Sequence, residues 1–277
     1  MIDDSPSTST SPQSPKPQDD SSFPDNPAPP SQQLVRIPVP QRAPYVTYAL
    51  IGITAVFYVL QILSVVLFSY PSTSTNMDWL EFYGARINEF IQMGQIWRLL
   101  TPALLHGSIM HIFFNMYALF TLGTNLERYF GHGRFLLLYW LAAFAGNVAS
   151  FLFTSGYSVG ASTAIFGIIS AEGVFLFQNR KLFGSQARRA IGNVVFVIVI
   201  NLFIIGSLPF IDNWGHIGGL LGGVMFTALA GPLWDVEVGS VGQGYTLMDR
   251  RPTRDMLIGA AAVLFVFGAL AFWGIVR

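Results

Sequence analysis

Long apolar segments alternate with more polar connections from residue 46 to residue 276. Each has a length suited to a helix that crosses a membrane. The segments cover residues 46–68, 109–126, 134–154, 162–178, 190–207, 216–233 and 256–276. Several are close to the short limit, as is typical of helices packed inside a bundle. The pattern predicts an all-α fold, a polytopic membrane helical bundle with seven transmembrane helices.

The first forty-two residues have a different pattern. They are rich in Ser, Pro, Asp and Gln and contain few large apolar side chains. Such a segment buries too little apolar surface to offset the entropy of ordering, so residues 1–42 are predicted to be a disordered cytoplasmic tail. Residues 43–233 are predicted to form a six-helix core. Residues 234–277 are predicted to be a cytoplasmic linker followed by the seventh helix.

Basic residues concentrate in alternate connections between the apolar segments. If every segment crosses the membrane, only Arg86, Arg98 and Arg277 lie on one side. The other side holds Arg36, Arg42, Arg128, Arg134, Arg180, Lys181, Arg188, Arg189, Arg250, Arg251 and Arg254. The positive-inside rule then predicts a cytoplasmic N-terminus. The segments that begin at 109, 162 and 216 would all run inward from the outer face.

Composition supports a membrane protein and excludes several other classes. The chain is 52% hydrophobic and 11% charged, whereas soluble domains contain about 25% charged residues. A formal net charge of zero argues against a nucleic-acid partner. The absence of cysteine excludes disulfides, a thiolate nucleophile and cysteine metal sites. No targeting segment is visible, which favours a bacterial plasma membrane, with a eukaryotic organelle as the alternative.

Polar side chains stand at the outer ends of the three inward-running segments. These are His111, Ser162 and His216, and Asn115 shares a helix face with His111 because it follows four residues later. At one membrane depth they suit acyl transfer, with Ser162 attacking a carbonyl and His216 taking its proton. The oxyanion would receive hydrogen bonds from Asn115, His111 and the Ser162 backbone N–H. The active site would face the outer side.

No carboxylate is well placed to complete a triad. Glu172 would lie about 15 Å deeper than Ser162 along its helix, and Asp212 precedes the segment that carries His216. A Ser–His dyad is therefore predicted, without a cofactor or metal. A zinc site from His106, His111 and His216 is a weaker alternative, since no acid or cysteine lies close by in sequence.

Glycines indicate close packing of the segment that carries His216. Gly219 with Gly223, and Gly218 with Gly222, form two small-xxx-small stripes. The predicted partner is the segment that begins "GASTAIFG", residues 160–167, because its side chains are also small. Packing there would bring His216 to Ser162.

The remaining polar residues are predicted to be structural. We expect His106 to make a structural hydrogen bond and His132 to be solvated. Glu127 with Arg128 is expected to be a cytoplasmic pair at a helix end. Trp97–Arg98 is expected to hold the preceding loop at the membrane interface.

Four motifs give the chain a family resemblance over residues 97–226. They are "WR" at Trp97–Arg98, "HGSIMHIFFN", "GAST" and "GHIGGLLGG". In this order the chain resembles the rhomboid intramembrane serine proteases, with a helix added after a six-helix core. The resemblance implies Ser162 as nucleophile and His216 as base. It also implies His111 and Asn115 as oxyanion donors, with Gly160, Phe166, Gly219 and Gly223 in support. Phe166 would stack on His216, and loop 69–100 would lie partly in the outer leaflet.

One residue departs from the family pattern. Thr163 stands where the motif Gly-x-Ser-Gly has its second glycine. A β-branched side chain is stiffer and larger than glycine, so it could crowd the dyad. It could equally occupy a position where glycine is not needed.

The predicted function is an intramembrane serine endopeptidase that uses a Ser–His dyad to cleave other membrane proteins within or near their transmembrane segments. A substrate helix must unwind to expose its carbonyl, so segments with Gly or Pro near the outer end are favoured. One alternative is a catalytically inactive rhomboid-like protein that binds membrane helices, although such a protein would be expected to lack Ser162, His216 or both. Another is a small-solute transporter, although the sequence has no inverted repeat.

Overall fold

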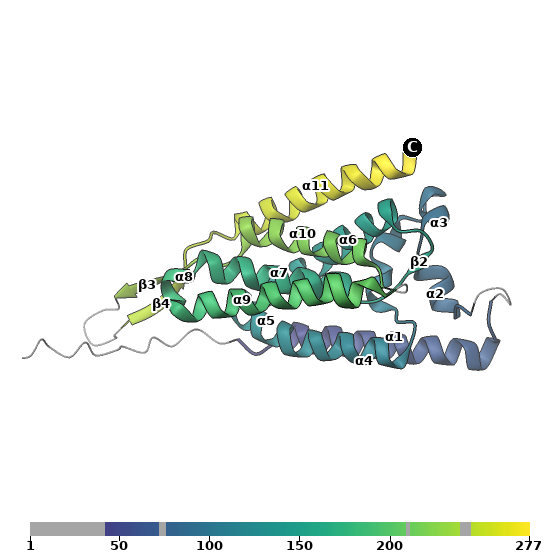
Figure 1. The fold of residues 1–277 in the computed structure, drawn as a ribbon, viewed down its shortest axis with the longest axis horizontal. Helices are drawn as coiled ribbons and strands as arrows, with labels where there is room; N and C mark the ends of the chain where they lie inside the picture. Colours follow the sequence, from purple (N-terminus) through teal and green to yellow (C-terminus); the bar gives the residue numbers. More distant parts are fainter. Residues whose placement is uncertain (1–41, 72–75, 209–210, 239–244) are drawn as a thin grey trace, which may run out of the picture. The chain divides into compact units, whose positions relative to one another are not determined.

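The computed structural model of the protein describes residues 42–71, 76–208, 211–238 and 245–277 (Figure 1). The predicted tail, apart from Arg42, lies outside these residues, so its disorder stays a prediction. The described residues are mostly helical. The longer helices are α1 (Tyr45–Phe68), α4 (Ile109–Ala118), α5 (Thr124–Phe130), α6 (His132–Phe153), α7 (Ser162–Gln178), α9 (Ser185–Val199), α10 (Asn213–Ala230) and α11 (Arg254–Val276).

Each predicted apolar segment corresponds to helical structure. α4 continues through the π-turn η3 (Leu119–Gly123) into α5, and α9 continues through η4 (Ile200–Ile204) and η5 (Ile205–Ser207). Among the described residues, four helical stretches are long and apolar enough to cross a membrane: 45–68, 132–153, 185–207 and 254–276. α7 is apolar but shorter. The helical bundle is confirmed, and the number of seven membrane crossings stays a prediction.

The core forms where α6, α7 and α10 pack side by side (Figure 1). A methyl group at Gly219 would lie 2.0 Å from the backbone oxygen of Thr163, and one at Gly223 would lie 2.3 Å from that of Gly167. This stripe therefore packs on α7, as predicted. The Gly218–Gly222 stripe packs on α6 instead, where a methyl at Gly218 would lie 2.5 Å from Cβ of Ala149. One helix thus contacts two neighbours through two glycine faces.

Glu127 connects α5 to the beginning of α1. Its buried carboxylate accepts hydrogen bonds from the backbone N–H groups of Val46 and Thr47, at 2.9 and 2.8 Å, and from the Thr47 hydroxyl at 2.6 Å. It also contacts Nδ1 of His132 at 2.6 Å. The predicted pair of Glu127 with Arg128 is therefore wrong, and His132 is only partly solvated, since its side chain is 40% exposed and contacts this carboxylate. The carboxylate instead satisfies N–H groups that the first turn of a helix leaves without partners.

The loop after α1 is folded and joined to the loop before α7. It contains α2 (Trp79–Gly84), α3 (Asn88–Gln92), η1 (Ile96–Leu99) and η2 (Thr101–Leu104). Strand β1 (Arg86–Ile87) pairs antiparallel with β2 (Tyr157–Ser158). Arg98 is buried and donates to the backbone oxygens of Ala85 and Phe82, both at 2.8 Å. Its predicted structural role is confirmed, and the guanidinium holds the loop together from inside.

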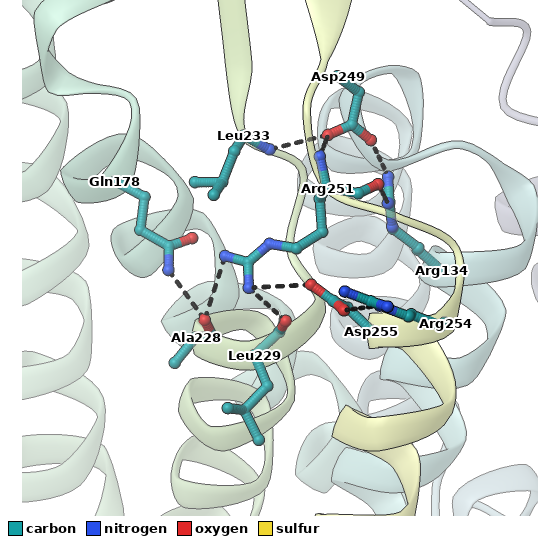
Figure 2. A network of polar contacts seen from close by, with 9 residues as sticks. All are labelled: Arg134, Gln178, Ala228, Leu229, Leu233, Asp249, Arg251, Arg254 and Asp255. Carbon is teal, nitrogen blue, oxygen red and sulfur yellow. Dashed lines mark hydrogen bonds and ion pairs between the residues drawn. The ribbon is translucent and has the colours of Figure 1, made fainter.

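An antiparallel strand pair precedes α11, where the sequence predicted only a linker. β3 (Trp234–Val238) alternates apolar and polar residues in sequence, a pattern that favours a strand, and it pairs with β4 (Tyr245–Asp249). Figure 2 shows the polar contacts around Asp249 and Arg251, where the strand pair meets the helices. Asp249 accepts from the N–H groups of Leu233 and Arg251, both at 3.0 Å, and pairs with Arg134 of α6. The guanidinium of Arg251 donates to the carbonyl of Leu229 at the end of α10.

Candidate active site

α7 begins at Ser162, directly after a turn that requires glycine. Gly160 has φ +124°, a conformation that side-chain-bearing residues rarely adopt. A methyl group there would lie 2.7 Å from Cε1 and Nε2 of His111 and 3.8 Å from Oγ of Ser162. Glycine therefore permits both the turn and the approach of the His111 ring to the backbone beside Ser162.

The turn is held to η2 and to the segment after η2. The N–H of Gly160 donates to the carbonyl of Pro102 at 2.9 Å, and the N–H of Ala161 donates to Nε2 of His106 at 3.4 Å. His106 is buried, and its ring meets that of His111 edge to face with centroids 5.0 Å apart. The structural hydrogen bond predicted for His106 is confirmed. It satisfies a donor that the N-terminus of α7 would otherwise leave without a partner.

His216 meets Ser162 from the first turn of α10. Its Nε2 lies 3.1 Å from Oγ of Ser162, which is hydrogen-bonding distance. Phe166, one turn into α7, stacks on the imidazole with ring centroids 4.0 Å apart and an interplanar angle of 10°. The stacking contact implied by the resemblance is thus present. The ring is held so that one nitrogen faces the hydroxyl, the arrangement in which a histidine can accept a proton from a serine.

Asp212 has a structural role that was not predicted from the sequence. It caps α10 by accepting from the N–H of Gly215 at 3.0 Å, and it accepts hydrogen bonds from the α6 side chain Ser150 and from Thr154, the latter at 2.8 Å. Burial alone would raise the pKa of Asp212, but these bonds together lower it below its usual value. An Asp directly before a helix is an N-cap signal that could have predicted this role.

Asp212 does not complete a triad within the described residues. Nδ1 of His216 has no hydrogen-bond partner there. The carboxylate of Asp212 instead accepts hydrogen bonds from Ser150, Thr154 and the N–H of Gly215. The carboxylate therefore positions the helix that carries His216.

His111 and Asn115 lie on the first turns of α4. Ser108 caps this helix by accepting from the N–H of His111 at 3.2 Å. The side chain of Asn115 is buried and donates one N–H to the carbonyl of His111 at 2.9 Å, which fixes its rotamer. The second N–H of this amide is not used in that bond. α4 thus places the His111 ring against Gly160 and orients the Asn115 amide.

The described residues do not bring metal ligands together. No group of three His, Asp or Glu side chains in this part of the chain is arranged to hold a metal ion. The alternative zinc site of His106, His111 and His216 is not formed there, since Nε2 of His106 faces a backbone N–H and Nε2 of His216 faces a hydroxyl.

Comparison with known proteins finds relatives in bacteria and plants. The chain is 45% identical over 179 residues to the rhomboid protease GluP of Bacillus subtilis, across 64% of this chain and 34% of that protein. It is 37% identical over 209 residues to RHOMBOID-like protein 6, mitochondrial, of Arabidopsis thaliana, across 72% of this chain and 65% of the relative. RHOMBOID-like protein 9, chloroplastic, of the same plant is 32% identical over 175 residues, across 62% of this chain and 40% of the relative.

The chain matches only part of each of these relatives. It spans between about a third and two thirds of their lengths. Two of their names refer to mitochondria and chloroplasts. The bacterial plasma membrane and the orientation within it therefore stay predictions.

The sequence model of the family described as "Rhomboid domain" matches residues 93–233, which is more than half of the chain. The matched range contains η2, α4, α7 and α10, which carry the residues described above. With its long apolar helices, the protein is a multi-pass membrane protein. The chain belongs to the rhomboid family.

Proposed function

We propose that this protein is an intramembrane serine endopeptidase in which Ser162 is the nucleophile and His216 the general base. The observation that carries the proposal is the 3.1 Å contact between Oγ of Ser162 and Nε2 of His216, on an imidazole stacked against Phe166. A relative that is 45% identical is named a rhomboid protease, which supports the same class of reaction.

The reaction begins when Oγ of Ser162 attacks a substrate carbonyl and its proton passes to Nε2 of His216. The carbonyl oxygen becomes an oxyanion. The N–H of Ser162 is available to it, because the first residues of a helix have no partner within the helix. The His111 ring and the Asn115 amide are the further donors.

His216 then returns the proton to the leaving amine, and the peptide bond breaks to give an acyl-enzyme. A water molecule, deprotonated by the same imidazole, hydrolyses the ester and regenerates Ser162. Because helical backbone carbonyls are already hydrogen-bonded, the substrate must unwind before attack. We therefore propose transmembrane segments weakened by Gly or Pro near their outer end as the substrate class.

The test is labelling with a fluorophosphonate probe in detergent, with cleavage of a reporter transmembrane segment measured in parallel. We expect wild-type protein to react and Ser162→Ala and His216→Ala to lose both activities. Ser170→Ala is the matched control, because this serine lies on the same helix but donates to the carbonyls of Gly167 and Leu220.

Two outcomes would contradict the proposal. Full cleavage by Ser162→Ala would remove the serine from the reaction. Absence of labelling in folded wild-type protein would favour a rhomboid-like protein that binds membrane helices without cleaving them.

A further inference from the structure

Thr163, the residue directly after Ser162, is enclosed by glycines of two neighbouring helices. It is buried at the second position of α7. A methyl group added at Gly146 of α6 would lie 2.5 Å from its Cβ and 2.8 Å from its Cγ2, and it would also lie 2.6 Å from the carbonyl oxygen of Gly215 on α10. One added at Gly215 of α10 would lie 3.2 Å from the same Cγ2. The side chain therefore fills a space that Gly146 leaves open on α6, and its methyl group packs close to Gly215, where an added methyl would also lie 2.9 Å from the Asp212 carboxylate.

This space lies beside both members of the dyad. Thr163 follows Ser162, and Gly215 precedes His216, so the Cγ2 methyl stands between the two backbone segments that carry the reacting groups. The backbone of Thr163 is also in tight contact with α10, since a methyl at Gly219 would lie 2.0 Å from its carbonyl oxygen. The start of α7 thus contacts α10 both at Gly215 and, through the Thr163 backbone, at Gly219.

The shape of Thr163, not its polarity, accounts for these contacts. Its hydroxyl is buried and has no hydrogen-bond partner among the described residues. Its Cβ and Cγ2 make the contacts to Gly146 and Gly215. A β-branched side chain has a restricted χ1 angle, so it acts as a stiffer spacer than an unbranched one.

We propose that Thr163 is a positioning residue, matched in size to Gly146 and Gly215, that sets the separation of Ser162 and His216. The proposal rests on the proposed function. It explains how the chain keeps a close hydroxyl–imidazole contact with threonine at a family glycine position, because the volume added on α7 is accommodated by a glycine on α6.

The first test is a double-mutant cycle with Thr163→Gly, Gly146→Ala and the double variant. We expect Gly146→Ala to lower kcat about tenfold or more, since a misplacement of the reacting groups by about 1 Å can cost about a hundredfold in rate. Thr163→Gly should fold and lower kcat with little change in KM. The double variant should recover part of the loss caused by Gly146→Ala, because the contact with Thr163 is relieved while the contact of the added methyl with the carbonyl oxygen of Gly215, at 2.6 Å, remains. An equal loss from Gly146→Ala in the wild-type and Thr163→Gly backgrounds would overturn the proposal.

Two further variants separate shape from hydrogen bonding. Thr163→Val keeps the contacts of both branches and should retain the kcat and the pH profile of the wild type. Thr163→Ser keeps the hydroxyl but loses the methyl and should lower kcat. A lower kcat in Thr163→Val than in Thr163→Ser would overturn the proposal. If the Gly146→Ala variants do not fold, this pair of variants is the deciding test.

Thermal unfolding of the same variants separates this inference from the proposed function. Coupling of Tm between positions 163 and 146 needs no catalysis, so it should appear even if the wild type fails to react with the probe. If the wild type reacts and neither Tm nor kcat shows coupling, the positioning role is wrong while the proposed function stands.

Discussion

At the scale of single residues, the proposed reaction depends on side chains whose positions are fixed by contacts beyond the reacting atoms. Phe166 holds the imidazole of His216 by stacking, and the carbonyl of His111 holds the Asn115 amide. Gly160 allows the His111 ring to approach the backbone beside Ser162. Preorganised donors of this kind act without reorganising during the reaction.

Replacement of Asn115 by alanine tests the oxyanion role. We expect turnover to fall by about ten- to a thousandfold, because one donor to the developing charge is lost. Asn125→Ala is a matched control, since Asn125 makes the same kind of hydrogen bond, to the carbonyl of Thr121, from an exposed position. Equal rates for the two variants would remove Asn115 from the site.

The burial of Glu81 predicts that the stability of the protein depends on pH. It is buried in a capping box with Asp78, whose carboxylate accepts from the N–H of Glu81 at 2.9 Å. Burial, with a smaller contribution from the charge of Asp78, raises the pKa of Glu81 to about 7. The folded state therefore binds this proton more tightly than the unfolded state, in which the pKa is about 4.3.

The stability that Glu81 contributes is fully present below about pH 4.3 and is lost as the pH rises through about 7. We expect the free energy of unfolding to fall across this window in the wild type and to change less in Glu81→Gln. Thermal unfolding in detergent at a series of pH values measures this. Glu89→Gln, an exposed acid in the same loop, should behave like the wild type.

At the scale of elements, polar groups at helix ends determine which helices meet. Asp212 connects the start of α10 to α6, and Glu127 connects the start of α1 to α5. Asp249 and Arg134 connect the strand pair to α6 (Figure 2). In each case a carboxylate accepts from groups on a different element, so a helix terminus is joined to the rest of the bundle.

Replacement of Glu127 by glutamine tests this anchoring. We expect a loss of about 2 kcal/mol in the free energy of unfolding, because a buried carboxylate that accepts bonds from Val46, Thr47 and His132 becomes a neutral amide. Chemical unfolding in detergent measures the loss. Glu237→Gln is the control, since Glu237 pairs with the exposed Arg250 and should change stability little. Similar losses in both variants would argue against the anchor.

At the scale of the whole molecule, the distribution of basic residues predicts orientation in the membrane. The chain contains no cysteine, so single cysteines report orientation without background. Asn76, in the loop before α2, and Arg188, on α9, are both exposed. We expect a membrane-impermeant maleimide added to intact cells to label Asn76→Cys and not Arg188→Cys. The opposite pattern would reverse the predicted orientation, and labelling of both only after lysis would indicate an internal membrane.

The sequence by itself determined the helical bundle, the family and the candidate site. Apolar segments of membrane-spanning length indicate helices directly, and the order of the motifs placed Ser162 and His216 at the starts of two helices that the structure brings together. Such features depend on local residue patterns and on the spacing of motifs along the chain, and both can be identified directly in a sequence.

Only the tertiary structure decided the partners of groups whose neighbours are distant in sequence. In the structure, Gly218 and Gly222 pack against α6. Glu127 forms hydrogen bonds with α1, and Asp212 accepts a hydrogen bond from Ser150. The tertiary structure also placed Thr163 against Gly146, which no local pattern indicates. The physical reason is that close packing and burial of a carboxylate depend on which surfaces meet after folding, and residues far apart in the chain supply those surfaces.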